Sequence, residues 1–354
     1  MKVLVAMSGG VDSSVAATLL RREGDHVTGV TMRLWGGESD TGCCSVSDVD
    51  DARRVAQQLD IDHLVFNFGD DFEQHVVSPY VDAHRGGSTP NPCIECNRRL
   101  KFDRLAERAR VLGFDALATG HHARVRNADG RWTLRRGADR AKDQSYVVHM
   151  LDQRALPRIR FPVGELRDKA EVRRVAAELG LRTATKPDSQ DVCFIPTHGG
   201  RASFLSRRIP FHPATVIDTA GSTVGTVPIV ELVTVGQRRG LGLATAGAGR
   251  KRYVVEVDPA TATVMVGSDA DLLVGRAVVG GVTWVDGPVD GPVLVQCSAH
   301  GAAHAARATH AGGDRVDIEW DEPQRRVAPG QSLVFYDTDD DRVLGGGIAQ
   351  RSPT

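Results

Sequence analysis

Residues 8–15 read Ser-Gly-Gly-Val-Asp-Ser-Ser-Val and directly follow the apolar run 3–7. The run predicts a short buried strand, and the apolar spacing after the loop predicts a helix. Gly9 and Gly10 let the backbone approach an anion and adopt positive φ, while the serines supply hydroxyl donors. The first N–H groups of the helix have no partner within it and point into the loop. This arrangement suits a phosphate or a pyrophosphate.

Thiols are the second set of side chains that could do chemistry. Cys93 and Cys96 follow two prolines and precede a basic helix, and we expect Cys96 near its N-terminus, where the dipole and nearby arginines favour the thiolate. A half zinc site is the alternative, although no second Cys-x-x-Cys exists. Cys193 precedes Phe-Ile, a context more typical of a buried thiol. The other cysteines are expected to be structural or in the core, with Cys297 on a strand: Cys43, Cys44 and Cys297.

The loop requires a scaffold, and the first 120 residues supply alternating strands and helices. Such alternation implies an α/β domain with a doubly wound parallel sheet. Ligands in these sheets bind beyond the carboxyl ends of the strands. The loop, Met32 and Gly120 fall at that edge, so one nucleotide could touch all three. The expected strands are Lys2–Met7, His26–Met32, His63–Asn67 and Ala116–Thr119, and helices are expected over 46–59 and 102–112.

The chain changes character near Thr197–Gly200, after a predicted helix over Lys169–Leu179 and a predicted loop over 186–195. Beyond this point, short β-branched runs are broken by Gly and Pro, which is typical of small barrels and sandwiches. We expect a PP-loop-type catalytic domain over 1–200, a small mixed central domain over 201–270 and a β-rich, barrel-like domain over 271–354. The expected strands are 215–218, 253–257, 263–266, 277–284, 293–297, 315–320 and 332–336.

Composition excludes several classes of protein. The 354 residues are 41% hydrophobic and 25% charged, as in globular proteins. No run approaches a membrane helix, the N-terminal run is too short for a signal peptide, and a cytoplasmic protein without structural disulfides is expected. The net charge is −1. Basic clusters at 98–104, 131–142, 238–239 and 250–252 permit nucleic-acid binding without demonstrating it.

The loop is neither the Gly-x4-Gly-Lys-Ser/Thr loop of kinase-like NTPases nor a dinucleotide Gly-x-Gly-x-x-Gly. It resembles the pyrophosphate loop (PP-loop) of enzymes that cleave ATP to AMP and pyrophosphate and adenylate a substrate oxygen. The loop is followed by seven further sequence motifs. Their order and spacing closely resemble those of the bacterial tRNA-specific 2-thiouridylases over almost the whole length of the chain. Those motifs are 89–102, 119–124, 142–146, 161–164, 188–195, 236–242, and 334–337 with 344–347.

The resemblance implies a two-step reaction on the wobble uridine of tRNAs for Lys, Glu and Gln. ATP, with Mg²⁺, adenylates the C2 oxygen, and a persulfide sulfur then displaces AMP. By position, Cys193 would carry the persulfide, and Cys96 would be the nucleophile that closes a transient disulfide with Cys193. A cysteine desulfurase or a sulfur-relay protein would supply the sulfur.

The resemblance also assigns binding residues by position. Two departures matter: Cys93 stands where some relatives have an Asp proposed as acid/base, so its role stays open, and 298–301 replaces the family's frequent Arg-Tyr tRNA contact. The ATP residues are Ala6, Met7, Ser8, Gly9, Gly10, Val11, Asp12, Ser13, Met32 and Gly120; the target-base segment is Asn91, Pro92 and Cys93; further tRNA contacts are His121, Lys142, Asp143, Gln144 and Gln331.

Three alternatives remain. Cys93, Cys96 and Cys193 could hold three irons of a [4Fe–4S] cluster whose fourth iron binds sulfide, giving the same reaction without a persulfide. A different adenylating ligase could use the loop, although this leaves the cysteines and the β-rich C-terminal third unexplained. A non-catalytic tRNA-binding module would explain neither the intact loop nor the two cysteines.

Overall fold

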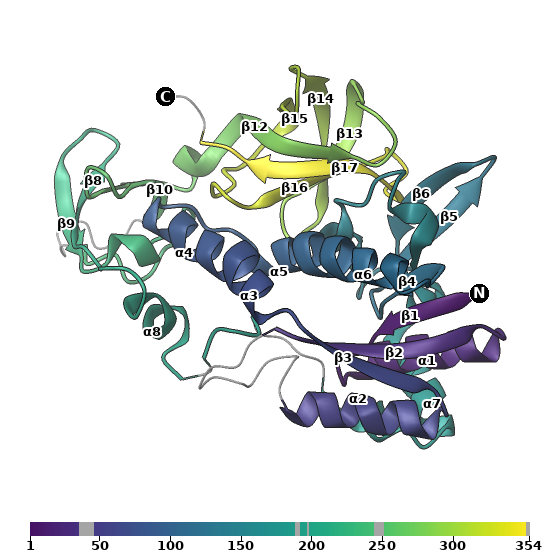
Figure 1. Ribbon diagram of the computed structural model, residues 1–354. Coiled ribbons are helices and arrows are strands. Elements are labelled where there is room, and N and C mark those ends of the chain that lie inside the picture. Colours follow the sequence, from purple (N-terminus) through teal and green to yellow (C-terminus); the bar gives the residue numbers. More distant parts are fainter. Residues whose placement is uncertain (35–45, 188–191, 197, 244–250, 352–354) are drawn as a thin grey trace.

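The computed structural model describes residues 1–34, 46–187, 192–196, 198–243 and 251–351. Cys43, Cys44 and part of the predicted 186–195 loop therefore lie outside the described residues. Three sheets organise the chain, in the order of the sequence (Figure 1). They correspond to the α/β domain, the mixed central part and the barrel that the sequence predicts.

The first sheet has the strand order β3-β2-β1-β4-β7, and every neighbouring pair is parallel. This confirms the predicted doubly wound sheet, and the four predicted strands match within one residue at either end. The short β7 was not predicted. The bounds are β1 Lys2–Ala6, β2 His26–Arg33, β3 Asp62–Asn67, β4 Ala116–Ala118 and β7 Ile159–Arg160.

Strand β1 shows why the sheet is covered on both faces. Val3 and Val5 pack into one apolar cluster with helices α1, α2 and α7, whereas Leu4 between them packs into a second cluster, since successive side chains of a strand point to opposite faces. The second cluster includes side chains of the helices between Gly69 and Val111, which lie between the sheet and the barrel (Figure 1). The bounds are α1 Val11–Arg22, α2 Val46–Gln58, α7 Lys169–Glu178, α3 Gly69–Phe72, η1 Glu73–Val77 and α4 Ser78–Arg85.

The central sheet has the order β10-β11-β8-β9, with only β11 and β8 parallel. The C-terminal strands are antiparallel, and pairing of β12 with β17 closes them into a barrel. The missed strands β9, β14 and β17 carry few large apolar side chains. The bounds are α8 Gly200–Ser206, β8 Ala214–Asp218, β9 Thr223–Val227, β10 Tyr253–Asp258, β11 Thr263–Gly267, β12 Leu273–Trp284, β13 Gly291–Gln296, β14 Ala303–His310, β15 Val316–Arg325, β16 Ser332–Tyr336 and β17 Arg342–Ala349.

The β5–β6 hairpin was not predicted and is the main exception to domain order along the chain. Strands β5 (Ala123–Ala128) and β6 (Arg131–Arg136) lie early in the sequence, yet β6 pairs with β17 and extends the barrel sheet. The N-terminal part of the chain is thus hydrogen-bonded directly to the barrel.

The helix that carries Cys93 and Cys96 begins earlier than expected. Helical structure starts at Pro92 and continues as α5 (Pro92–Glu95), η2 (Cys96–Leu105) and α6 (Ala106–Val111). Pro92 occupies the first helical position, and the Asn91 side chain accepts a hydrogen bond from Cys93 N, which is an N-cap. Cys93, and not Cys96, therefore lies in the first turn. Cys297 also differs from expectation, because it lies just after β13 and is only half-buried.

Two buried histidines predict a pH-dependent stability. Burial lowers the pKa of His84 to about 4, with the Arg201 charge adding to the shift, and burial lowers the pKa of His149 likewise to about 4. Because both folded pKa values lie below the unfolded value of 6.5, stability is complete above pH 6.5 and declines as the pH falls toward 4. Each histidine contributes about 3 kcal/mol to this decline. Urea unfolding between pH 7.5 and 4.5 measures the decline. The variant His84→Leu is expected to make the dependence of stability on pH less steep, and an unchanged slope would contradict this.

Candidate active site

The loop after β1 is shaped to receive an anion. Helix α1 begins after Gly10, and no side chain in the described part of the chain caps it, so its first N–H groups stay available to a ligand. Gly9 has φ +70°, and a Cβ there would lie 2.4 Å from the carbonyl oxygen of Asp48. Ser13 Oγ accepts from Ser8 N at 3.2 Å, whereas the buried Ser14 hydroxyl donates to the Gly10 carbonyl. The loop therefore requires glycine, and Ser14 serves the helix rather than a ligand.

Asp12, in the first turn of α1, forms an ion pair with Lys169 and a hydrogen bond with His122. Lys169 Nζ is 2.7 Å from both carboxylate oxygens, and His122 Nε2 is 3.1 Å from Oδ1. Burial raises the pKa of Asp12, but the hydrogen bonds and charges of His122 and Lys169 outweigh it, so the pKa of Asp12 is lowered. Asp12 is consequently an anion held beside an anion site, neutralised by Lys169.

Lys169 and His122 were not among the predicted site residues. The sequence does contain a signal for Lys169. A cation in the first turn of a helix is unfavourable because it opposes the helix dipole, so its presence there indicates a negatively charged partner elsewhere. Helix α7 tolerates Lys169 there, since Asp168 caps the helix through a 2.7 Å hydrogen bond from Glu171 N. Only the tertiary structure brings the amine to Asp12, 157 residues away.

The predicted ATP residues Met32, within β2, and Gly120, after β4, lie at different depths. Gly120 lies against the loop, because a Cβ on it would be 2.6 Å from Ser13 N and 2.7 Å from the Asp12 carbonyl carbon. Met32 is buried in the core of the sheet. The fold thus brings the Thr119-Gly120 turn onto the first turn of α1, as expected for parallel strands β1 and β4.

The segments that carry Cys96 and Cys193 meet at one core cluster. Both half-buried cysteines pack against the cluster that covers the upper face of the sheet. Phe194 anchors the second segment: it is 1% exposed, and its ring contacts those of Phe72 and Tyr80 at 5.6 and 5.4 Å. The α3–α4 helices hold this aromatic group and contact α5 and η2. Two thiols that are far apart in the sequence therefore pack against the same core cluster.

A second lysine ties the segment before Cys193 to the anion loop. Lys186 Nζ is 2.7 Å from Asp48 and 2.8 Å from Asp51, both in α2. The Asp48 carbonyl is the atom that faces Gly9. Helix α2 thus connects the loop around residue 9 with the chain that leads to Cys193.

The predicted tRNA contacts His121, Asp143 and Gln144 make contacts within the protein. His121 Nδ1 is 2.6 Å from Thr119 Oγ1, and burial holds the pKa of His121 well below its ordinary value, with the Lys101 and His122 charges adding to the shift. Asp143 pairs with Arg136 at 2.8 Å. Gln144 Oε1 accepts from His122 N at 2.9 Å. Gln144, His122 and Asp12 therefore form a continuous chain from the Lys142–Gln144 segment to the anion loop.

The basic cluster at 131–142 is largely paired with carboxylates. Arg135 contacts Asp341, and Arg136 contacts Asp340 at 2.6 Å while its guanidinium lies 3.6 Å from the centre of the Tyr336 ring. Arg136 also donates to Gln296, whose amide binds the Ser298 carbonyl at 2.8 Å. These arginines fasten the β5–β6 hairpin to the barrel and hold the 298–301 turn, which removes them from a free basic surface.

Asn91 and Gln331 are far apart in the sequence, and the segments that carry them lie near each other. Gln331 Nε2 donates to the Thr89 carbonyl, two residues before Asn91.

Within the described ranges, no group of three His, Cys, Asp or Glu side chains is arranged to hold a metal. No helix in the same residues is long and apolar enough to cross a membrane.

An uncapped anion loop at the carboxyl edge of a parallel sheet, followed by a small β domain and a closed barrel, defines an ATP-using enzyme of the PP-loop class. Family models agree along the chain: the tRNA methyl transferase HUP domain matches residues 1–197, the tRNA methyl transferase PRC-barrel domain 202–268 and the aminomethyltransferase beta-barrel domain 277–349.

Curated relatives match nearly the full length. The tRNA-specific 2-thiouridylase MnmA of Herpetosiphon aurantiacus is 46% identical, over 98% of this chain and 97% of its own, and that of Clostridium perfringens is 42% identical, over 99% and 98%. A solved 4-thiouridine synthetase–RNA complex with bound ATP is only 18% identical, with a TM-score of 0.35 over 58% of this chain and 49% of its own. The chain belongs to the MnmA family of tRNA-specific 2-thiouridylases.

Proposed function

We propose that the protein is a tRNA-uridine 2-sulfurtransferase that acts on the wobble uridine of tRNAs for Lys, Glu and Gln. It uses ATP to adenylate the C2 oxygen and then replaces that oxygen with sulfur. The order of steps follows from chemistry, since a uracil carbonyl oxygen leaves poorly and AMP leaves well. The observation that carries the proposal is that Cys96 and Cys193 both pack against one core cluster, against which Ala6 of β1, directly before the loop, also packs.

In the first step, the uridine C2 oxygen attacks the α-phosphorus of ATP, and pyrophosphate leaves. The ligands proposed for ATP are Ala6–Ser13, Met32 and Gly120. The uncapped first turn of α1 supports pyrophosphate binding there. Mg²⁺ prefers one or two carboxylates together with phosphate oxygens; because both oxygens of Asp12 accept hydrogen bonds from Lys169, we assign the ion to the phosphates. The ion would neutralise phosphate charge.

In the second step, the terminal sulfur of a Cys193 persulfide attacks C2, and AMP leaves with the C2–O electron pair. The Cys96 thiolate then attacks Cys193 Sγ. The S–S electron pair moves to the sulfur on C2, which yields 2-thiouridine and a Cys96–Cys193 disulfide. A thiol reductant restores the two thiols, and a cysteine desulfurase or a relay protein reloads Cys193.

The proposed tRNA surface runs from the target-base segment Asn91–Cys93 to Gln331 and the Lys142–Gln144 segment. Because the side chains of His121, Asp143 and Gln144 are used inside the protein, we assign them to shaping this surface, and Lys142 to contacting the RNA. Cys93 is exposed in the first turn of α5, and its role is left open. We propose limits at 200 and 270 for the three domains, and a cytoplasmic location beside the tRNA pool.

The test is mass spectrometry of nucleosides from unmodified tRNA after incubation with the protein, ATP, Mg²⁺, a cysteine desulfurase and cysteine. The expected product is 2-thiouridine at the wobble position, absent without ATP, with pyrophosphate release that depends on tRNA. Equal pyrophosphate release with and without tRNA would favour a different adenylating ligase. No pyrophosphate release and no thiolation, with tRNA still bound, would favour a non-catalytic binding module.

The [4Fe–4S] alternative makes a separate prediction on the same assay. A cluster on Cys93, Cys96 and Cys193 would give stoichiometric iron and acid-labile sulfide after anaerobic purification, with activity proportional to iron. Under the persulfide scheme, activity is independent of iron.

A further inference from the structure

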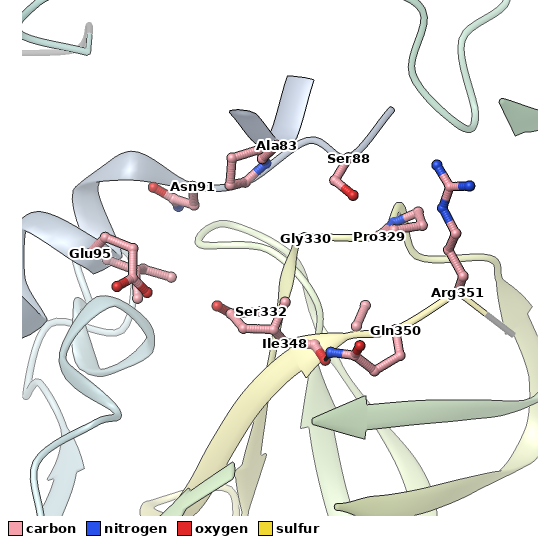
Figure 2. A pocket seen from close by; sticks show the side chains of 13 residues that line it. Ala83, Ser88, Asn91, Glu95, Pro329, Gly330, Ser332, Ile348, Gln350 and Arg351 are labelled. Carbon is pink, nitrogen blue, oxygen red and sulfur yellow. Dashed lines mark hydrogen bonds between the residues drawn. The ribbon is translucent and has the colours of Figure 1, made fainter. Parts of the chain in front are cut away.

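A cavity of about 530 Å³ lies between the catalytic domain and the barrel. Figure 2 shows side chains of α4 and α5 on one side and of the barrel on the other facing the same space. Its volume lies within the range of small-molecule pockets. None of the assigned ATP residues lines it.

The cavity lies on the side of α5 that faces away from the cysteines. Asn91 and Glu95 line it, and Arg98, one turn further, donates to Thr283 of β12 at 3.3 Å. At 3.6 residues per turn, the Cys93 and Cys96 positions lie roughly 120–180° around the helix from this face. A ligand here would be separated from Cys93 and Cys96 by the width of the helix.

Hydrogen bonds between the two walls fix the distance between them. Thr89 N donates to the Pro329 carbonyl at 2.8 Å, and Arg351 Nη2 donates to the Gly86 carbonyl at 2.5 Å. Gly330, with φ +92°, passes so close that a Cβ on it would lie 3.1 Å from Pro90 N. The site is therefore preformed.

The lining fits a nucleobase with its phosphate outward. Pro90, Ile94, Pro329 and Ile348 supply apolar surfaces for a flat ring. The Glu95 carboxylate lies 3.5 Å from Arg98 Nε and 3.8 Å from Arg99 Nε, and its remaining acceptor sites can bind base N–H groups. Ser332 lines the cavity, is 1% exposed, and its hydroxyl has no hydrogen-bond partner among the described residues. Such a group is satisfied when a ligand supplies the partner. The exposed Arg351 at the rim can contact a phosphate.

We infer that this cavity binds a nucleotide of the tRNA that flanks the target uridine. The inference rests on the proposed function, because Asn91, a wall of the cavity, belongs to the proposed target-base segment and Gln331 adjoins its other wall. A strand that delivers its uridine to the cysteine side of α5 places a neighbouring nucleotide on the opposite side.

The test measures binding of an anticodon stem–loop RNA to the full chain by fluorescence anisotropy. Ser332→Ala is expected to raise Kd about 3- to 10-fold, the value of one hydrogen bond, without lowering Tm, since the hydroxyl has no partner within the described ranges. Ile348→Trp, which fills the cavity, is expected to raise Kd more than about 10-fold. Leu273→Trp is the matched control, because Leu273 is an exposed barrel residue away from the cavity. ATP affinity stays unchanged in all three.

A second probe carries an abasic site at each nucleotide that flanks the uridine in turn. When the abasic site replaces the nucleotide that occupies the cavity, the wild type is expected to bind the probe as weakly as the variants bind the intact probe. This result identifies that nucleotide. Equal Kd for wild type, Ser332→Ala and Ile348→Trp on the intact probe, with thiolation intact, would overturn the inference alone. Absence of any thiolation by the wild type would instead overturn the proposed function.

Discussion

Cys193→Ser is expected to abolish tRNA thiolation, with a loss of more than about 1000-fold, while tRNA-dependent pyrophosphate release continues. Serine preserves the size of the side chain but cannot carry a persulfide. The loop around residues 8–13 and the Asp12–Lys169 pair remain intact in the variant. AMP and pyrophosphate release, measured beside nucleoside mass spectrometry, separate the two steps.

The matched control is Cys297→Ser. Burial raises the pKa of Cys297 to about 12, so this thiol stays protonated, and it packs against the barrel core rather than beside the loop. Full activity is expected. Thiolation that survives in Cys193→Ser would refute the persulfide assignment, and Cys93→Ser then tests the cluster scheme, under which it would lose both iron and activity.

Lys169→Met is expected to lower kcat/KM for ATP roughly 10- to 150-fold, the effect of a charge-assisted hydrogen bond. The methionine leaves Asp12, whose lowered pKa keeps it ionised, without its neutralising amine in a site that must accept polyphosphate. Repulsion between the carboxylate and the phosphates then opposes binding. Pyrophosphate release as a function of ATP concentration measures the effect.

Two variants control for this interpretation. Lys169→Arg retains the charge and should recover most activity. Arg174→Met removes a cation from the exposed side of the same helix, where it contacts Glu171 and Glu178, and should have no effect on ATP. If Lys169→Met changed tRNA affinity as much as kcat/KM for ATP, or lowered Tm enough to unfold the protein, a structural role would replace the proposed one.

Local patterns were sufficient where neighbours in sequence supply the structure. The predicted strands of the parallel sheet match within one residue, because continuous apolar runs between glycines are typical of buried strands. The helix at Pro92 was placed too late. Asn91 and Pro92 carry N-cap and N1 signals, but the polar run from Asn97 to Arg99 obscured the apolar periodicity.

Contacts across the sequence could not be read in this way. The β5–β6 hairpin joins the barrel through Arg136, whose partners Asp340 and Tyr336 lie about 200 residues further along the chain. Strand β17 is rich in glycine, so its propensity is weak, and pairing with β12 and β16 decides its structure. Such strands form because neighbours satisfy their backbone groups.

The sequence by itself determined the loop at residues 8–13, the parallel sheet that carries it and, through resemblance, the two cysteines. Each depends on local spacing or on a residue type that no other can replace. The tertiary structure alone decided that Lys169 and His122 meet Asp12, that Lys186 joins α2, and that a preformed cavity lies behind α5. These features arise from folding, because they depend on which distant surfaces the closed barrel and the covered sheet bring into contact.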